Sequence, residues 1–113
     1  MDSLALTRLA EEQIAAARSA ASGRSARTLH GGRDRVLRQI LMGLANGHGL
    51  GAHENPGEAT LQVVAGRVRL STDEHSWEGG TGDYVIIPPR QHALDAIEDS
   101  AVILTVVPAA GTR

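Results

Sequence analysis

Residues 82–92 contain a turn, a short apolar run and a corner, in the order Gly82-Asp83-Tyr84-Val85-Ile86-Ile87-Pro88-Pro89-Arg90-Gln91-His92. Aromatic and β-branched residues such as those at 84–87 favour a strand. Proline lacks the N–H that a strand interior requires, so the two prolines mark the strand's end. The stretch therefore predicts a strand buried on both faces, followed by a corner that presents His92.

A second stretch with a chemical signature precedes it at residues 51–66, Gly51-Ala52-His53-Glu54-Asn55-Pro56-Gly57-Glu58-Ala59-Thr60-Leu61-Gln62-Val63-Val64-Ala65-Gly66. His53 and Asn55 are two residues apart, so on a strand they point to the same face. This is the spacing by which one strand offers two ligands to one metal ion. The run around Leu61–Val64 predicts a further strand, and Asn-Pro-Gly-Glu at 55–58 is also a good turn sequence.

Short strands with turn signals between them account for most of the remaining sequence. Residues 67–70 alternate strictly between arginine and aliphatic residues, which predicts a strand with one wet face. The run 101–107 is rich in β-branched residues and predicts a strand buried on both faces. Residues 36–44 fit a helical stripe as well as a strand, and Gly32 and Gly43 favour the strand. This pattern is typical of a β-sandwich or barrel.

The N-terminal segment has a different periodicity. Apolar residues recur at three- and four-residue steps through 3–22, which predicts a helix with a thin, mostly alanine stripe. Asp2 or Ser3 can cap its start, and Ser22-Gly23 can end it. We expect a peripheral helix in residues 1–23 and a β-barrel domain in residues 24–113.

The composition excludes several classes of protein. A chain of 113 residues forms one domain. It has no cysteine and all 11 basic residues are arginine, so thiolate, disulfide and lysine chemistry are absent. The formal charge of −2 argues against a nucleic-acid partner. No apolar run is long enough for a membrane span, and the basic region of a signal peptide is missing. We therefore expect a cytoplasmic protein that does not bind membranes.

The stretches 51–66 and 82–92 together resemble the two motifs of the cupin superfamily. The first resembles its His-x-His motif with a terminal glycine, and the second resembles its Gly-Asp strand with a proline and a closing histidine. The resemblance covers roughly residues 33–107. It implies an all-β fold, a double-stranded β-helix or jelly-roll barrel, with a metal in the barrel mouth and often a homodimer.

The resemblance assigns the expected metal ligands residue by residue. His53 matches the first histidine and His92 the closing one, while Asn55 stands where the second histidine would be. The usual acid or glutamine falls on Ala59, and Glu58 lies one position early, so a regular strand turns it to the other face. We expect His53, His92 and Asn55 to form the site, with one divalent Mn, Fe, Ni, Cu or Zn ion. Both histidines could equally be remnants in a barrel without metal.

Three functions remain open. The chain could be a metal-dependent enzyme acting on a small organic substrate, a non-catalytic module that binds or senses a small molecule, or a dimeric interaction module. The other histidines, His30, His48 and His75, are expected in solvated loops or strands and not as ligands. The arginines at 33, 35, 38, 67 and 69 are interpreted as solvated strand faces, with contact to an anionic ligand or RNA as the alternative. The sequence Ser71-Thr72-Asp73-Glu74-His75 is interpreted as a polar turn and not a catalytic triad.

Overall fold

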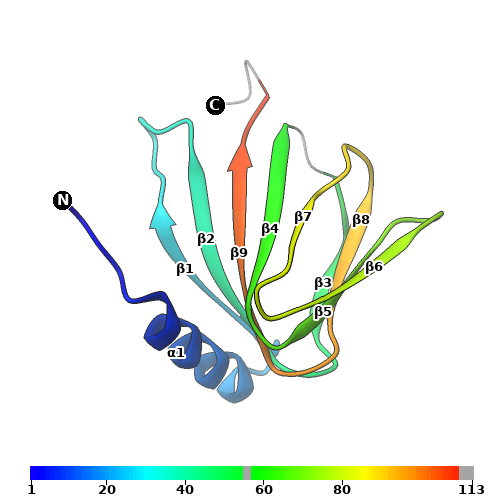
Figure 1. The fold of residues 1–113 in the computed structure, drawn as a ribbon, viewed down its shortest axis with the longest axis horizontal. Helices are drawn as coiled ribbons and strands as arrows, with labels where there is room; N and C mark the ends of the chain where they lie inside the picture. Colours follow the sequence, from blue (N-terminus) through cyan, green and yellow to red (C-terminus); the bar gives the residue numbers. More distant parts are fainter. Residues whose placement is uncertain (55–56, 110–113) are drawn as a thin grey trace.

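The computed structural model describes residues 1–54 and 57–109. Within these residues the chain forms one helix and nine strands (Figure 1). Their bounds are α1 (Leu6–Ser19), β1 (Arg24–His30), β2 (Arg38–Leu44), β3 (Gly49–His53), β4 (Glu58–Ala65), β5 (Arg67–Ser71), β6 (Ser76–Gly80), β7 (Tyr84–Ile86), β8 (His92–Ala96) and β9 (Ser100–Val107).

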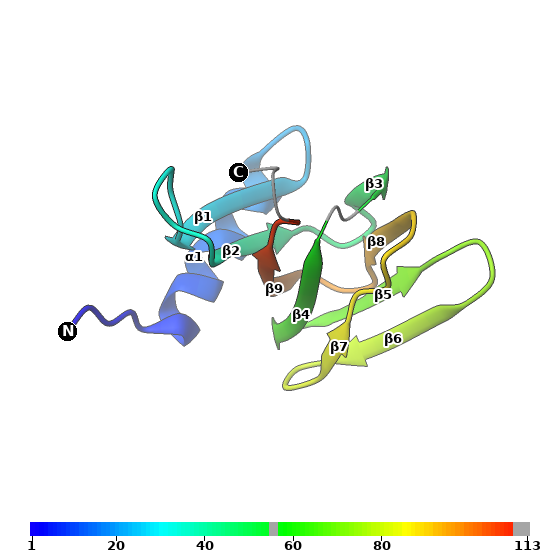
Figure 2. The ribbon, with the colours of Figure 1, turned by 90° about the horizontal axis from the view of Figure 1, so that it is seen from above.

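The strands form two antiparallel sheets that face each other. One sheet has the order β1-β2-β9-β4-β7 and the other has the order β3-β8-β5-β6. The sheets lie close together at one end of the molecule and separate toward the other end, which we call the mouth (Figure 1). Figure 2, the view from above, shows the two sheets on opposite sides of the interior. The predicted all-β jelly roll with an N-terminal helix is confirmed.

Aliphatic side chains fill the space between the sheets. The cluster includes Leu61 and Val63 of β4, Val68 and Leu70 of β5, and Val102 of β9, all at most 5% exposed. The predicted alternation in residues 67–70 is confirmed, because both arginines there are exposed. Residues 38–44 form β2, so the ambiguous segment is a strand, and Val36 and Leu37 lie exposed in the loop before it.

The helix covers the outer face of the five-stranded sheet. Leu9 and Ala10 are buried in a second cluster with Leu41, Ala101 and Ile103. The side-chain hydroxyl of Ser25 donates a hydrogen bond of 2.7 Å to the Gln13 carbonyl oxygen, which ties α1 to β1. The expected peripheral position of the helix is therefore correct. Because its stripe is small, α1 lies close to the sheet.

Two details of the helix prediction are wrong. The helix begins at Leu6 and ends at Ser19, so it is shorter than residues 3–22. Neither Asp2 nor Ser3 caps it, because the residue at the cap position is Ala5, whose side chain cannot accept a hydrogen bond. The described residues contain no helix with the length and apolar composition that crossing a bilayer requires.

The prediction that residues 84–87 are buried on both faces is also wrong. Tyr84 is 57% exposed and Ile86 is 69% exposed. β7 is an edge strand of the five-stranded sheet, and α1 covers a different part of its outer face. Only Val85 and Ile87 reach the interior. β9 lies at the centre of the sheet, so residues 101–103 are buried on both faces as predicted, whereas residues 104–107 of the same run are only half-buried.

The contact between α1 and β2 leaves no room for a side chain at Gly43. A Cβ atom there would collide with the Gln13 carbonyl oxygen and with the Ser25 hydroxyl. We expect Gly43→Ala to push the helix away and to lower the free energy of unfolding by about 1–3 kcal/mol, as overpacking does. Urea denaturation measures the change.

Gly51→Ala is the matched control, because a Cβ atom at Gly51 meets nothing within 4 Å. It should leave the stability unchanged or raise it slightly. An equal loss of stability in both variants would show that the close approach of the helix is not the cause.

Candidate functional site

The two histidines of the sequence motifs are direct neighbours on adjacent strands. β3 ends at His53 and β8 begins at His92, and the antiparallel register of these strands pairs the two residues. Their ring centroids are 4.4 Å apart and the ring planes meet at 60°. The two imidazoles are therefore in contact at the mouth, although they are 39 residues apart in the sequence.

Each imidazole is fixed by a hydrogen bond to the backbone. The Nδ1 atom of His53 lies 2.8 Å from the Gly51 carbonyl oxygen, and that of His92 lies 2.9 Å from the Arg90 carbonyl oxygen. A carbonyl oxygen only accepts, so Nδ1 is the protonated nitrogen and donates in both rings. In a neutral imidazole this leaves Nε2 with a free lone pair, the arrangement that metal-binding histidines use.

The two side chains differ in exposure and share a small interior cavity. His92 is 4% exposed, whereas His53 is exposed at the mouth. The cavity has a volume of about 20 Å³, enough for one water molecule or one ion. Besides the two histidines it is lined by apolar side chains, which are Met42, Leu50, Leu61, Leu70, Ile87, Leu94 and Leu104.

The other candidate ligands do not join this pair in the described structure. Asn55 lies outside the described residues, so its role stays a prediction. Glu58 is exposed at the start of β4, and its neighbour Ala59 is 5% exposed in the interior cluster. Alternation along the strand therefore turns the Glu58 carboxylate away from the interior. Within residues 1–54 and 57–109, no group of three or more histidine, aspartate or glutamate side chains could hold a metal ion.

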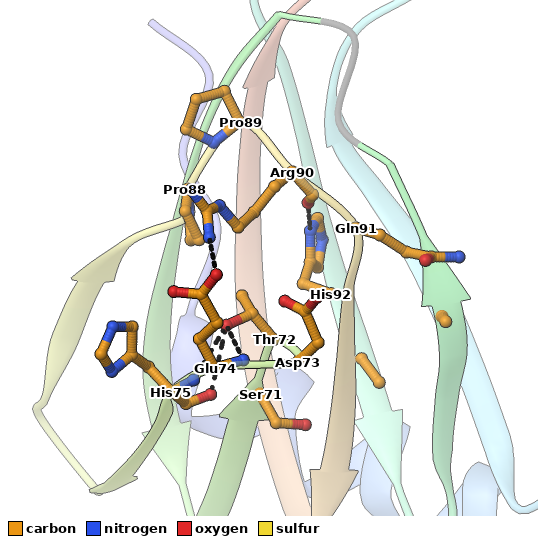
Figure 3. Close-up of a pocket in the computed structure, with 12 residues that line it drawn as sticks. Ser71, Thr72, Asp73, Glu74, His75, Pro88, Pro89, Arg90, Gln91 and His92 are labelled. Atoms are coloured by element: carbon orange, nitrogen blue, oxygen red, sulfur yellow. Dashed lines mark hydrogen bonds and ion pairs between the residues drawn. The ribbon is translucent and has the colours of Figure 1, made fainter.

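A much larger groove lies beside His92 (Figure 3). It has a volume of about 800 Å³ and is open to solvent. One wall is the end of β5 with the β5–β6 turn, residues 71–75, and the other is the segment 88–91 that follows β7. Arg90 and Glu74 reach toward each other from these two walls, with 3.8 Å between Nη1 and Oε1. His92 lines both this groove and the interior cavity.

Sequence reasoning missed the residues of this groove. Residues 72–75 form a turn, as expected, whereas Ser71 is the last residue of β5. A 2.8 Å hydrogen bond from the Thr72 amide to the His75 carbonyl oxygen closes the turn. The turn lines a groove only because Ser71 pairs with Ala93 across β5 and β8, which brings it beside residues 88–91. No local pattern in the sequence indicates this long-range register.

Comparison with solved structures finds the same fold in several bacterial proteins. A conserved protein of unknown function from Streptococcus pyogenes, SPY1581, is 26% identical with a TM-score of 0.71, over 81% of this chain and 80% of its own. An RmlC-like cupin from Shewanella frigidimarina is 21% identical with a TM-score of 0.68, over 80% of each chain. The DMSP lyase DddQ from Ruegeria pomeroyi is 18% identical with a TM-score of 0.68, over 80% of this chain and 49% of the lyase chain.

Comparison of the sequence with family models agrees with the fold. No curated protein matches the chain. A family model described as a cupin domain matches residues 40–108, more than half of the chain and both histidines of the pair. The chain therefore belongs to the cupin family.

Proposed function

We propose that this protein binds one divalent transition-metal ion at the barrel mouth through the Nε2 atoms of His53 and His92. The observation that carries the proposal is the pair of Nδ1 hydrogen bonds to the carbonyl oxygens of Gly51 and Arg90. These bonds fix the tautomer of both rings and leave the metal-binding nitrogens free. With metal–nitrogen bonds of about 2.0–2.1 Å, a shared ion requires the two Nε2 atoms to lie within about 4 Å of each other, and the 4.4 Å between the ring centroids supports such an approach.

The donor set determines which ions fit and how they are held. Two neutral imidazoles suit Zn, Cu, Fe or Ni better than the hard cations Mg or Ca, which prefer oxygen ligands. Two protein ligands leave the remaining coordination positions to water, to an external ligand or to the Asn55 amide oxygen. Mn, with its preference for oxygen ligands, would depend most on these additional donors.

The sizes of the interior cavity and the outer groove favour an organic ligand that binds outside the barrel interior. A cavity of about 20 Å³ accommodates an ion but no metabolite, so it lends no support to an apolar ligand held inside the barrel. The outer groove of about 800 Å³ falls within the size range of small-molecule sites. His92 lines both spaces, so an ion on His92 would be reached from the groove. Bound there with open coordination positions, such an ion would supply Lewis-acid chemistry.

We therefore favour the hypothesis of a metal-dependent enzyme over a non-catalytic small-molecule module and a dimeric interaction module. The substrate of such an enzyme would be a small polar molecule that fits beside Arg90 and Glu74. The homodimer and the lack of a nucleic-acid partner, both expected from the sequence, stay predictions.

The tautomer of the two histidines can be observed directly. We expect both rings to carry the proton on Nδ1 in neutral form, because each Nδ1 donates to a carbonyl oxygen. Long-range ¹H–¹⁵N correlation spectra of the metal-free protein at alkaline pH distinguish the two tautomers. Spectra that show Nε2–H in both rings would contradict the proposed ligand geometry.

Metal binding tests the proposal itself. Untagged protein freed of metal with a chelator should bind one equivalent of Zn²⁺ in a calorimetric titration. His53→Ala should weaken the affinity at least about tenfold, because it removes one of two protein ligands. His92→Ala should do the same, and circular dichroism verifies that this buried substitution leaves the fold intact.

His75→Ala is the matched control, since His75 is exposed in the β5–β6 turn and outside the ring pair. It should bind Zn²⁺ as the unaltered protein does. The proposal fails if the double variant His53→Ala/His92→Ala retains the affinity of the unaltered protein.

A further inference from the structure

A second groove lies at the mouth on the side away from the histidine pair. It has a volume of about 380 Å³ and is formed by the end of β1, the loop that follows it and the start of β2. Its lining combines three basic side chains, His30, Arg33 and Arg38, with Thr28, Ile40 and the glycine pair 31–32. Among these described lining residues there is no aspartate or glutamate.

The charge of this region is opposite to that of the whole chain. Residues 24–38 hold five arginines and one aspartate, whereas the chain has a formal charge of −2. Asp34, the one acidic residue of the segment, is exposed in the loop and does not line the groove. A local excess of positive charge attracts anions, and a concave surface strengthens this attraction.

Some arginines of the described residues form ion pairs and others do not, and those of the groove belong to the second group, together with Arg8, Arg24, Arg27 and Arg35. Arg18, Arg67, Arg69 and Arg90 each form an ion pair with an aspartate or glutamate. Arg33 and Arg38 form no ion pair within the described residues, although Arg38 is half-buried. A guanidinium group without an acidic neighbour can form charge-assisted hydrogen bonds to an anion from solution. An anion in the groove would supply the missing partner.

The backbone shapes the loop so that the groove stays open. The β1–β2 ladder has an irregularity between Thr28 and His30, directly before Gly31 and Gly32. Both glycines adopt positive φ angles, 151° and 134°, which residues with a side chain rarely adopt. A Cβ atom at Gly32 would meet nothing within 4 Å, so the space beside it is free.

We propose that this groove binds the phosphate group of a small molecule, with the Arg38 and Arg33 guanidinium groups as its main partners. A phosphate group carries about −1.5 to −2 charges at neutral pH, which matches two arginines better than a single carboxylate does. The planar guanidinium group donates two parallel hydrogen bonds to such oxygens. The Thr28 hydroxyl and His30 add further polar groups to the same groove. The proposal is independent of the metal at His53 and His92.

Titration with inorganic phosphate tests this site. The ¹H–¹⁵N spectrum of the full chain is recorded in a phosphate-free buffer, with sodium chloride adjusted to keep the ionic strength constant. Saturable shifts should appear at the amides of Gly31, Gly32 and Arg38. Arg38→Gln should weaken the affinity at least about tenfold, since it removes a charge-assisted, bidentate partner. The spectrum of the variant also reports whether the fold is retained.

Arg27→Gln is the matched control. Leu29 and Ser25 contact the helix side of β1, so Arg27 between them lies on the face opposite to the groove. It carries the same change of charge and should retain the affinity for phosphate. If Arg38→Gln disturbs the fold, Arg33→Gln in the exposed loop replaces it, with the same expected direction.

Several outcomes would overturn the proposal. The first is the absence of saturable shifts on addition of phosphate. The second is an equal loss of affinity in Arg27→Gln and Arg38→Gln, which would show that phosphate responds to the overall charge and not to this groove. A short single-stranded oligonucleotide that binds far more tightly than phosphate and shifts residues outside the groove would point to nucleic acid instead. Retention of phosphate binding in His53→Ala/His92→Ala is expected, and its loss in that variant would show that the two sites are not independent.

Discussion

The close packing of small aliphatic side chains between the two sheets limits what the rest of the molecule can do. Trp77 and Tyr84 are the only aromatic residues of the chain, and Tyr84 is 57% exposed. Leucine and valine therefore fill most of the interior, at the density that protein cores share. The result is a barrel with a cavity of only about 20 Å³ beside the histidines. Larger ligands are left with the grooves around the mouth.

Strand register brings two histidines together at the mouth of this filled barrel. The pairing of β3 with β8 places His53 opposite His92, and the backbone on either side of the pair supplies the two carbonyl oxygens that orient the rings. A shift of one residue in either strand would send one imidazole to the opposite face. The same β8 places Ala93 beside Ser71, so the groove and the ring pair depend on one strand.

The charged side chains also differ between the two sides of the mouth. Ion pairs on the β5–β6–β8 side connect arginines to Glu74 and Glu78, and they are exposed, so each contributes little to stability. The β1–β2 side instead concentrates arginines without acidic partners among the described residues. The barrel thus presents a groove of mixed charge on one side of its mouth and a basic groove on the other. This separation would let two chemically different groups approach the same end of the molecule.

Local sequence patterns were enough to predict the β-rich class, the peripheral helix, the alternating strand at 67–70 and the two histidines as a pair of interest. These follow from local periodicity and from two short motifs, which neighbouring residues encode. The sequence also predicted correctly that Glu58 points away from the barrel interior, because alternation along a strand is a local property. The exposure of Tyr84 and Ile86 could not be predicted in this way, since burial depends on whether a strand lies at the edge of its sheet. The tertiary structure also sets the contact between the two imidazoles, the groove beside residues 71–75 and the lack of an acidic partner for Arg38 within the part of the chain that the structure describes. Each of these depends on pairing between segments distant in the chain, which no local pattern specifies.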